Sequence, residues 1–297
     1  MVMETTRNPA PHLALALCTV LASLFASSPA VAGYGWPVKP FHRQHPIRAY
    51  FGDPRIGADG HGGTSRSLHF GVDISAPNGT PVYATISGWV SRHPLHPSDV
   101  LLVRNGNVTF EYWHVVPVVD SGYAVAYRTV IGRVEAPWLH VHFAERHGST
   151  YVNPLRKGGM TPYRDTTRPV VREAGIERHG ASVDLVADAY DTTPLPVPRP
   201  WNDKPVTPAL VEWRVSGPHL AGRWTVAADF RDALPARPFD SVYTSATTQN
   251  YASSCGTYHF ILVQGWHAAS GSYVLTVRVR DTAGNVGVRS TRLAIGL

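Results

Sequence analysis

The stretch DVLLVRNGNVTFEYWHV, residues 99–115, decides the fold class of this chain. Apolar and polar residues alternate on both sides of Asn105-Gly106, and Asn-Gly between two such runs is the strongest local signal for a tight β-hairpin. In the second arm, Phe110, Tyr112 and His114 follow one another at every second position and should share one face of the strand. The segment therefore predicts two antiparallel strands, with a histidine at the end of the second.

The β pattern of this hairpin continues along the rest of the chain. Short runs rich in Val, Thr, Tyr and Trp are separated by Gly, Pro, Asn and Asp, and no segment has a long helical period. Residues 81–92 predict one strand with a bend at Gly88. A polar, Arg-rich stretch at 163–182 indicates a domain boundary, and six or seven short strands follow it, as in a β-sandwich. The Pro-rich residues 194–208 are expected to form a loop on this sandwich. We predict an all-β protein.

The first 32 residues have the pattern of an export signal. Arg7 precedes an apolar segment from Leu13 to Phe25, and Ala30-Val31-Ala32 fits the small-residue rule for signal-peptidase cleavage. We expect cleavage near Ala32 and a protein that is secreted or associated with the cell envelope. The apolar run is short for a bilayer span, and no later stretch predicts a transmembrane segment.

Charge and cysteine content narrow the classes of partner. The formal net charge is +6, but the basic residues are scattered along the chain instead of forming a run. This pattern argues against a nucleic-acid partner, and it fits equally well plain solubility or weak attraction to a polyanionic cell wall. Because Cys18 lies in the expected signal, Cys255 is left without a partner for an internal disulfide. The sequence does not indicate an oligomeric state.

Two histidines lie close together in WLHVHFAE, residues 138–145. On a strand, His140 and His142 would turn their rings to one side, while Val141 and Phe143 would point to the other. A half-buried strand with two imidazoles on one face suggests a site that uses them.

A carboxylate and another histidine lie in SLHFGVDIS, residues 67–75. His69 and Asp73 are four residues apart, and Gly71 between them permits a bend that brings the two side chains together. Two neutral imidazoles and one carboxylate form a good ligand set for zinc, with a fourth position left for water. The alternative, a satisfied surface pair plus chance spacing among fifteen histidines, requires several coincidences in one domain.

The order of these motifs resembles a known family. HFGVDISAPNGTPVYATISGWV is similar to the first motif of the lysostaphin-type (LytM-like) zinc metallopeptidases, which cleave peptide bonds in bacterial cell-wall peptidoglycan. YWHV and HVHF resemble their Tyr-x-His and His-x-His motifs, and the similarity covers about residues 45–156 in consistent order. It implies an antiparallel-sheet zinc peptidase domain, which we place at residues 33–165.

The same resemblance implies roles for five side chains. It makes His69, Asp73 and His142 the ligands of one zinc ion per chain. It makes His140 the general base and His114 its partner across the cleft.

Two features depart from the family pattern. A Ser-Thr-Gly-like turn usually precedes the His-x-His motif, but residues 135–138 here are Glu-Ala-Pro-Trp, which leaves the shape of the cleft open. The acidic residue expected directly after the phenylalanine is displaced by Ala144 to Glu145. The remaining histidines of this region are expected in solvated loops: His61, His93, His96 and His147.

The end of the chain has a second, vaguer likeness. WHAASGSYVLTVRVRDTAGNVGVRSTRLAI, residues 266–295, is similar to the closing strands of bacterial immunoglobulin-like domains, which implies a β-sandwich at residues 170–297 acting as a spacer or wall-binding unit. Asp281 and Asn285 could bind calcium, but turn formation explains their spacing more simply.

Three functional hypotheses follow. The first is a secreted zinc endopeptidase that hydrolyses peptidoglycan in its stem peptide or cross-bridge. The second is a D-alanyl-D-alanine carboxypeptidase, because Glu111-Tyr112-Trp113-His114 resembles the Glu-x-Trp-His of that superfamily, although no His-x-His is expected there. The third is a non-catalytic wall-binding or regulatory protein that retains the fold, which only the altered loop before His140 favours.

Overall fold

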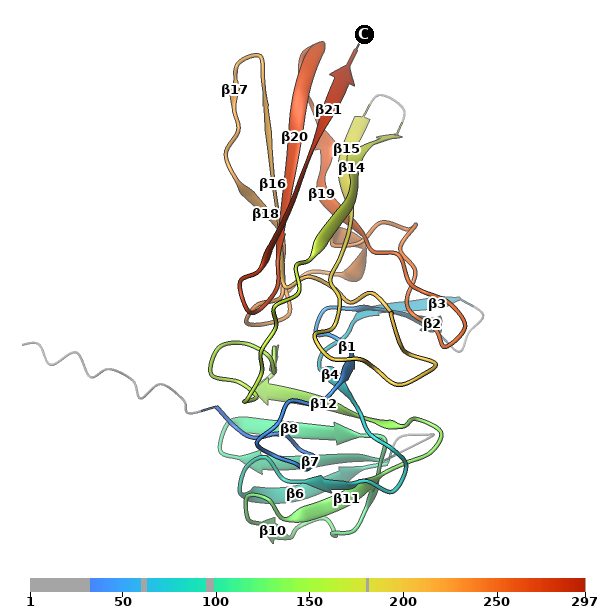
Figure 1. The fold of residues 1–297 in the computed structure, drawn as a ribbon, viewed down its shortest axis with the longest axis vertical. Helices are drawn as coiled ribbons and strands as arrows, with labels where there is room; N and C mark the ends of the chain where they lie inside the picture. Colours follow the sequence, from blue (N-terminus) through green and yellow to red (C-terminus); the bar gives the residue numbers. More distant parts are fainter. Residues whose placement is uncertain (1–32, 60–62, 95–98, 180–181, 297) are drawn as a thin grey trace, which may run out of the picture. The chain divides into compact units, whose positions relative to one another are not determined.

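A computed structural model describes residues 33–59, 63–94, 99–179 and 182–296 (Figure 1). The chain is nearly all-β with antiparallel sheets, which confirms the predicted fold class. One short 3-10 helix, η1 (Phe239–Ser241), is the only helical element in the described ranges. The expected export signal, Cys18, His61 and His96 all lie outside the described residues.

A large antiparallel sheet organises the N-terminal part of the described chain. Its strand order is β1-β4-β12-β8-β7-β6-β10, with β13 paired to β12, and Figure 1 shows β12, β8, β7 and β6 following one another. Its strands are β1 (Ile47–Ala49), β4 (Val72–Ser75), β6 (Gly88–His93), β7 (Val100–Asn105), β8 (Val108–Trp113), β10 (Ala124–Val125), β12 (His140–His147) and β13 (Thr150–Val152). Two smaller sheets contain β5 (Pro81–Tyr83), β11 (Val130–Val134) and β9 (Val115–Pro117), and β2 (Pro54–Ala58) with β3 (Thr64–Leu68).

The predicted hairpin forms from β7 and β8, but its turn lies one residue later than expected. Asn105 pairs with Val108, so Gly106 and Asn107 make the connection. Gly106 has a φ of 58°, which suits a turn with glycine at its first central position. The predicted strand at 81–92 is divided into β5 and β6, which belong to different sheets. At the start of β6, a side chain on Gly88 would collide with a backbone oxygen of β7.

The strand alternation predicted for the second arm of the hairpin stops before His114. Phe110 and Tyr112 are buried in the core, on the same side as Val141 and Phe143 of β12. His114 follows the end of β8 with a φ of 63°, in the left-handed region. Because of this backbone turn, the ring of His114 lines a cavity instead of the core. The prediction that His114 shares a face with Phe110 and Tyr112 is therefore wrong.

The C-terminal part contains two further antiparallel sheets. One has the order β14-β15-β19, and the other has the order β17-β16-β20-β21 with β18 paired to β16. The strands are β14 (Val170–His179), β15 (Ser182–Tyr190), β16 (Leu210–Gly217), β17 (Leu220–Ala221), β18 (Thr225–Asp229), β19 (His259–Trp266), β20 (Gly271–Arg280) and β21 (Val286–Ile295). Side chains from both sheets share one core. The immunoglobulin-like assignment and the domain limits 33–165 and 170–297 stay predictions.

Three local predictions can be compared with these strands. Residues 194–208 contain no strand, as expected for a loop. Much of the polar stretch at 163–182 is strand β14, so it is wrong to treat the whole stretch as a boundary. His93 and His147 are the last residues of β6 and β12, which corrects their expected place in loops.

The N-terminal part contributes to the core of the C-terminal part. Phe51 and Leu68 belong to the same buried cluster as the side chains of β15, β19 and β20. Backbone groups also join the two: Thr207 donates its N–H to Asp53 Oδ1 at 2.7 Å, and Ile56 donates its N–H to Gln249 Oε1 at 2.6 Å. The segment just before the candidate site is therefore held by residues more than a hundred positions later in the chain.

We expect Phe51→Ala to lower the free energy of unfolding by about 3–5 kcal/mol, because it removes a fully buried aromatic side chain from this shared core. Urea unfolding followed by fluorescence measures the change. Val288→Ala, at a residue 58% exposed, is the control and should change the value by less than about 0.5 kcal/mol. A change below about 1 kcal/mol for Phe51→Ala would contradict the role of Phe51 in joining the two parts.

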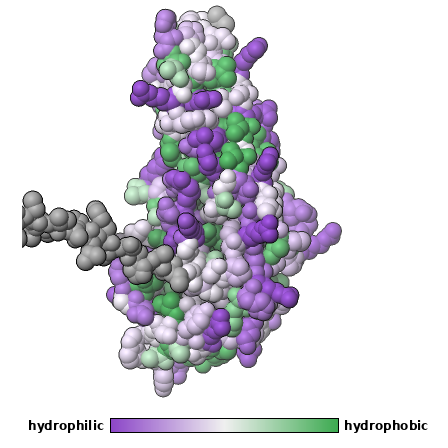
Figure 2. All heavy atoms as spheres, turned by 60° about the vertical axis from the view of Figure 1, so that its left-hand side comes forward, coloured by the Kyte–Doolittle hydropathy of each residue, from purple (hydrophilic) through white to green (hydrophobic). Residues whose placement is uncertain are grey.

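The surface mixes hydrophobic and hydrophilic side chains. The face shown in Figure 2 has green patches between purple residues, with no single continuous apolar area. Among the described residues, no helix is long and apolar enough to cross a membrane.

Candidate metal centre

The register of three neighbouring strands places the candidate ligands. On β12, His142 lies opposite Asp73 of β4 on one side and opposite Trp113 of β8 on the other. Gly71, just before β4, passes so close to β12 that a Cβ there would lie 2.9 Å from the ring of His142. The tight passage at Gly71 brings His69 back towards Asp73, as the sequence predicts.

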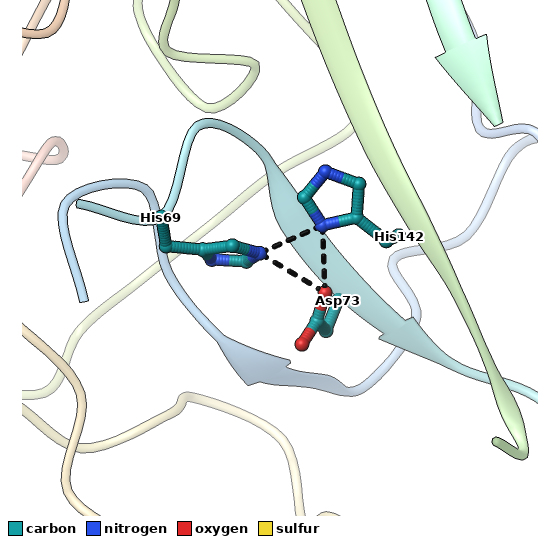
Figure 3. A group of neighbouring side chains, drawn as sticks. All are labelled: His69, Asp73 and His142. Atoms are coloured by element: carbon teal, nitrogen blue, oxygen red, sulfur yellow. Dashed lines mark hydrogen bonds and ion pairs between the residues drawn. The ribbon is translucent and has the colours of Figure 1, made fainter. Parts of the chain in front are cut away.

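Three side-chain atoms meet at one point (Figure 3). His69 Nε2 lies 2.7 Å from His142 Nδ1 and 3.1 Å from Asp73 Oδ1, and His142 Nδ1 lies 3.0 Å from the same carboxylate oxygen. All three residues are buried. The arrangement presents two imidazole nitrogens and one carboxylate oxygen to a common position.

Hydrogen bonds outside this triangle fix the proton on His69. His69 Nδ1 donates to the backbone oxygen of Tyr50 at 2.8 Å, and burial lowers the pKa of His69 to about 3, so the neutral ring turns the lone pair of Nε2 to the centre. A proton on His142 Nδ1 can bond to only one of the two atoms that face it, His69 Nε2 and Asp73 Oδ1. The lone pairs at the centre therefore outnumber the protons, and a bound cation would remove the repulsion between them.

Two arginines stabilise the charge on Asp73. Arg55 Nη2 lies 3.1 Å and Arg48 Nε 3.8 Å from Asp73 Oδ2. Burial by itself raises the pKa of Asp73, but the neighbouring His69, His140 and Arg55 outweigh burial and hold the pKa well below its usual value. Asp73 is therefore an ionised carboxylate at neutral pH.

His140 is held with one ring nitrogen facing the centre. Its Nδ1 donates to the backbone oxygen of Trp138 at 2.8 Å, which leaves Nε2 as an acceptor. This Nε2 lies 3.6 Å from Asp73 Oδ1 and accepts a hydrogen bond from Arg48 Nη2 at 3.3 Å. Burial lowers the pKa of His140 well below its usual value, so its ring is neutral.

His114 lies beside His140 on the same side of the centre. The two ring centroids are 4.7 Å apart, and the ring of Trp138 stacks on His114 at 4.2 Å. Burial lowers the pKa of His114 to about 4, so it is also neutral near pH 7. The altered loop at residues 135–138 therefore contacts both histidines through Trp138.

The five side chains line a cavity of about 520 Å³. This volume lies within the usual range for ligand pockets. Its other wall comes from the C-terminal part of the chain: Pro200, Trp201, Gln249, Asn250 and Ala252. Trp201 covers the guanidinium group of Arg48, whose carbon lies 4.2 Å from the ring centroid.

The donor set fits a catalytic zinc ion. Zinc in such sites takes three protein ligands of the nitrogen and oxygen type and keeps a further position for water or substrate. His69, Asp73 and His142 supply this set, and the cavity gives access to it.

Comparison with known proteins agrees with this geometry. A family model described as peptidase family M23 matches residues 67–154, a range that includes all five side chains. Residues 67–154 belong to peptidase family M23. This match confirms the resemblance to the LytM-like metallopeptidases stated above.

Other comparisons add less to the M23 assignment. One solved structure that matches is Csd3 of Helicobacter pylori, in an orthorhombic crystal, with a TM-score of 0.35 and 23% sequence identity. The match covers 45% of this chain and 36% of that chain, so the overlap spans little more than a third of Csd3. A search of the curated proteins found no match.

Sequence reasoning missed three residues around the M23 site. Arg48 stands between two buried residues of β1, a position that strand alternation would turn towards solvent, so the sequence gives no sign of its contact with Asp73. Arg55 and Trp201 also carry no local signal, because each reaches the site only through the folding of the chain.

Proposed function

We propose that the protein is a secreted zinc endopeptidase that hydrolyses peptide bonds within peptidoglycan. The observation that supports this most directly is the convergence of His69 Nε2, Asp73 Oδ1 and His142 Nδ1 in the lining of a cavity of about 520 Å³. In this proposal these three residues hold one zinc ion, and His140 and His114 act on the substrate. The M23 match supplies the reaction class.

Each side chain has a task that follows from its contacts. When bound, zinc supplies Lewis acidity that polarises a peptide carbonyl and makes water nucleophilic near neutral pH. The attacking water replaces the hydrogen bond from Arg48 and gives its proton to His140 Nε2, because the Nδ1–H of His140 is held by Trp138. His140 or His114 then returns a proton to the leaving amine as the C–N bond breaks. His114, neutral with one N–H, donates to the carbonyl oxygen as negative charge develops there.

The altered loop supports an active enzyme and argues against a non-catalytic relative. Trp138 provides the backbone oxygen that orients both His140 and Arg48, and its ring stacks on His114. The loop therefore replaces the usual turn with contacts that order the site.

Digestion of peptidoglycan tests the proposal. The purified protein is incubated with peptidoglycan, with and without a zinc chelator, and the new ends are identified by mass spectrometry. We expect chelator-sensitive cleavage inside the stem peptide or cross-bridge. Release of terminal D-alanine alone would indicate a carboxypeptidase, and the absence of any metal-dependent product would indicate a wall-binding or regulatory protein.

Trp201 in the C-terminal wall of the cavity should support the site through Arg48. We expect Trp201→Ala to lower kcat/KM about tenfold, because it removes a cation–π contact worth about 1–2 kcal/mol in a desolvated site, which holds Arg48 beside Asp73 and His140. Steady-state kinetics on a soluble cross-linked peptide measures this. Trp89→Ala, which removes an exposed tryptophan on β6, is the control and should leave both constants unchanged. An unchanged kcat/KM for Trp201→Ala would show that the site does not depend on this contact.

A further inference from the structure

A second group of acidic side chains lies away from the M23 site. Asp165, Asp191 and Asp281 each offer a carboxylate oxygen, and these three atoms lie within 4.8 Å of one another. Their residues are 5%, 0% and 4% exposed. Within the described part of the chain, none of these three carboxylates forms an ion pair, although other buried carboxylates do.

The three aspartates come from segments that are far apart in the sequence. Asp165 lies between β13 and β14, Asp191 directly follows β15, and Asp281 begins the turn between β20 and β21. Asn285 forms the expected turn with Asp281 by donating its N–H at 2.8 Å and its side-chain amide at 2.6 Å. The same amide reaches the backbone oxygen of Asp165 at 3.1 Å, so the turn also orients this third segment.

A buried oxygen of this group has no partner within the described part of the chain. Asp191 accepts a hydrogen bond from the N–H of Thr192 at Oδ1, but its Oδ2 is fully buried and has no hydrogen-bond partner there. A small cavity adjoins Asp191 and Asp281 and is also lined by Thr207 and Thr282. An unsatisfied buried carboxylate oxygen is costly, and its cost is removed by a cation or a proton.

The charges of the three carboxylates also favour a bound cation. Burial, together with the charges of the nearby Asp165 and Asp281, raises the pKa of Asp191 to about 8. Burial also raises the pKa of Asp281. Three carboxylates this close cannot all stay ionised without a neutralising charge.

We propose that Asp165, Asp191 and Asp281 bind a calcium ion that ties the segment after the M23 domain to both C-terminal sheets. The ligand atoms are all oxygen, which suits a hard cation. Calcium–oxygen distances of about 2.4 Å allow ligands to be up to about 4.8 Å apart, and the group meets this limit. Calcium fits better than magnesium, because magnesium usually keeps several bound waters and a buried site has little room for them. The proposal does not depend on the peptidase activity.

Thermal unfolding of the full chain tests the site. The protein is stripped of metal on a chelating resin and given one equivalent of zinc, and Tm is then measured with and without calcium chloride. We expect saturating calcium to raise Tm by about 5–10 °C, with magnesium giving a clearly smaller shift. His142→Ala, which removes a zinc ligand, should keep the calcium shift, and this separates the two metal sites.

Matched variants identify the ligands. Asp191→Asn and Asp281→Asn keep the side-chain size and should lose most of the calcium shift. Asp120→Asn, at an exposed aspartate between β9 and β10, should keep it in full. If calcium leaves Tm unchanged, the proposal is wrong, and a higher Tm for Asp191→Asn without calcium would show that shared protons hold the carboxylates.

A spectroscopic probe tests the site on the wild-type protein, so it does not depend on variants that fold. Tyr163 donates its hydroxyl to Asp165 Oδ2 at 3.1 Å, so a terbium ion in this site would lie beside a tyrosine. Terbium emission excited through tyrosine should appear on titration of the wild-type protein and disappear when calcium competes. Emission that calcium does not displace would overturn the assignment.

Discussion

Purified His142→Ala protein should contain no zinc and should not hydrolyse peptidoglycan. His142 Nδ1 is within 3.0 Å of both other candidate ligand atoms, so its loss leaves only one nitrogen and one carboxylate to hold the ion. Two ligands do not form the three-residue set that catalytic zinc sites use. Metal content by elemental analysis and the release of soluble peptides measure the two effects.

Two further variants make this prediction specific. His142→Gln keeps most of the packing against Phe70 and Trp113 and should also lose zinc, which separates ligation from packing. His93→Ala changes an exposed histidine of the same domain and should keep both zinc and activity. Full zinc content and normal turnover in His142→Ala would exclude His142 as a ligand.

His140→Ala should bind zinc normally and lose about 10²–10⁴-fold in kcat, the usual contribution of a general base. His140 stands beside the ligand triangle, with Nε2 3.6 Å from Asp73 Oδ1, and its removal leaves all three ligands in place. The same elemental analysis, combined with kinetics on a soluble peptide, distinguishes this result from ligand loss.

A second histidine helps to interpret the His140 result. His114→Ala should also retain zinc and should reduce kcat, because His114 faces the same cavity. If His140→Ala loses zinc along with activity, His140 is a ligand and the assignment of the base must change. If it keeps full activity, another group accepts the proton.

The fold class and the meeting of His69, Asp73, His140 and His142 could be predicted because the signals for them are local. Alternation in 138–145 fixes the shared face of His140 and His142, and the short spacing around Gly71 brings His69 to Asp73. His114 could be identified as a site residue, but its orientation could not, because it depends on one left-handed backbone angle. The roles of all five remain predictions that the variants above address.

The parts that could not be predicted depend on contacts between distant segments. Trp201 reaches Arg48 from a Pro-rich loop about 150 residues later, and nothing in that loop indicates a cleft wall. The sequence noted Asp281 and Asn285, but Asp165 and Asp191 join them only when three separate segments meet. Pairing order and packing, which set these meetings, leave no trace in a short window of sequence.

The shared core around Phe51 has a practical consequence for anyone fusing parts of this chain to other modules. Grafting residues 33–165 alone onto a foreign binding module would uncover Phe51 and Leu68 and strip the cleft of Trp201. A fusion should therefore carry residues 33–165 together with the C-terminal residues that cover Phe51 and Leu68. Insertions are better tolerated at the exposed turn of Ser121 and Gly122, between β9 and β10, than at the junction that the sequence marks as a boundary.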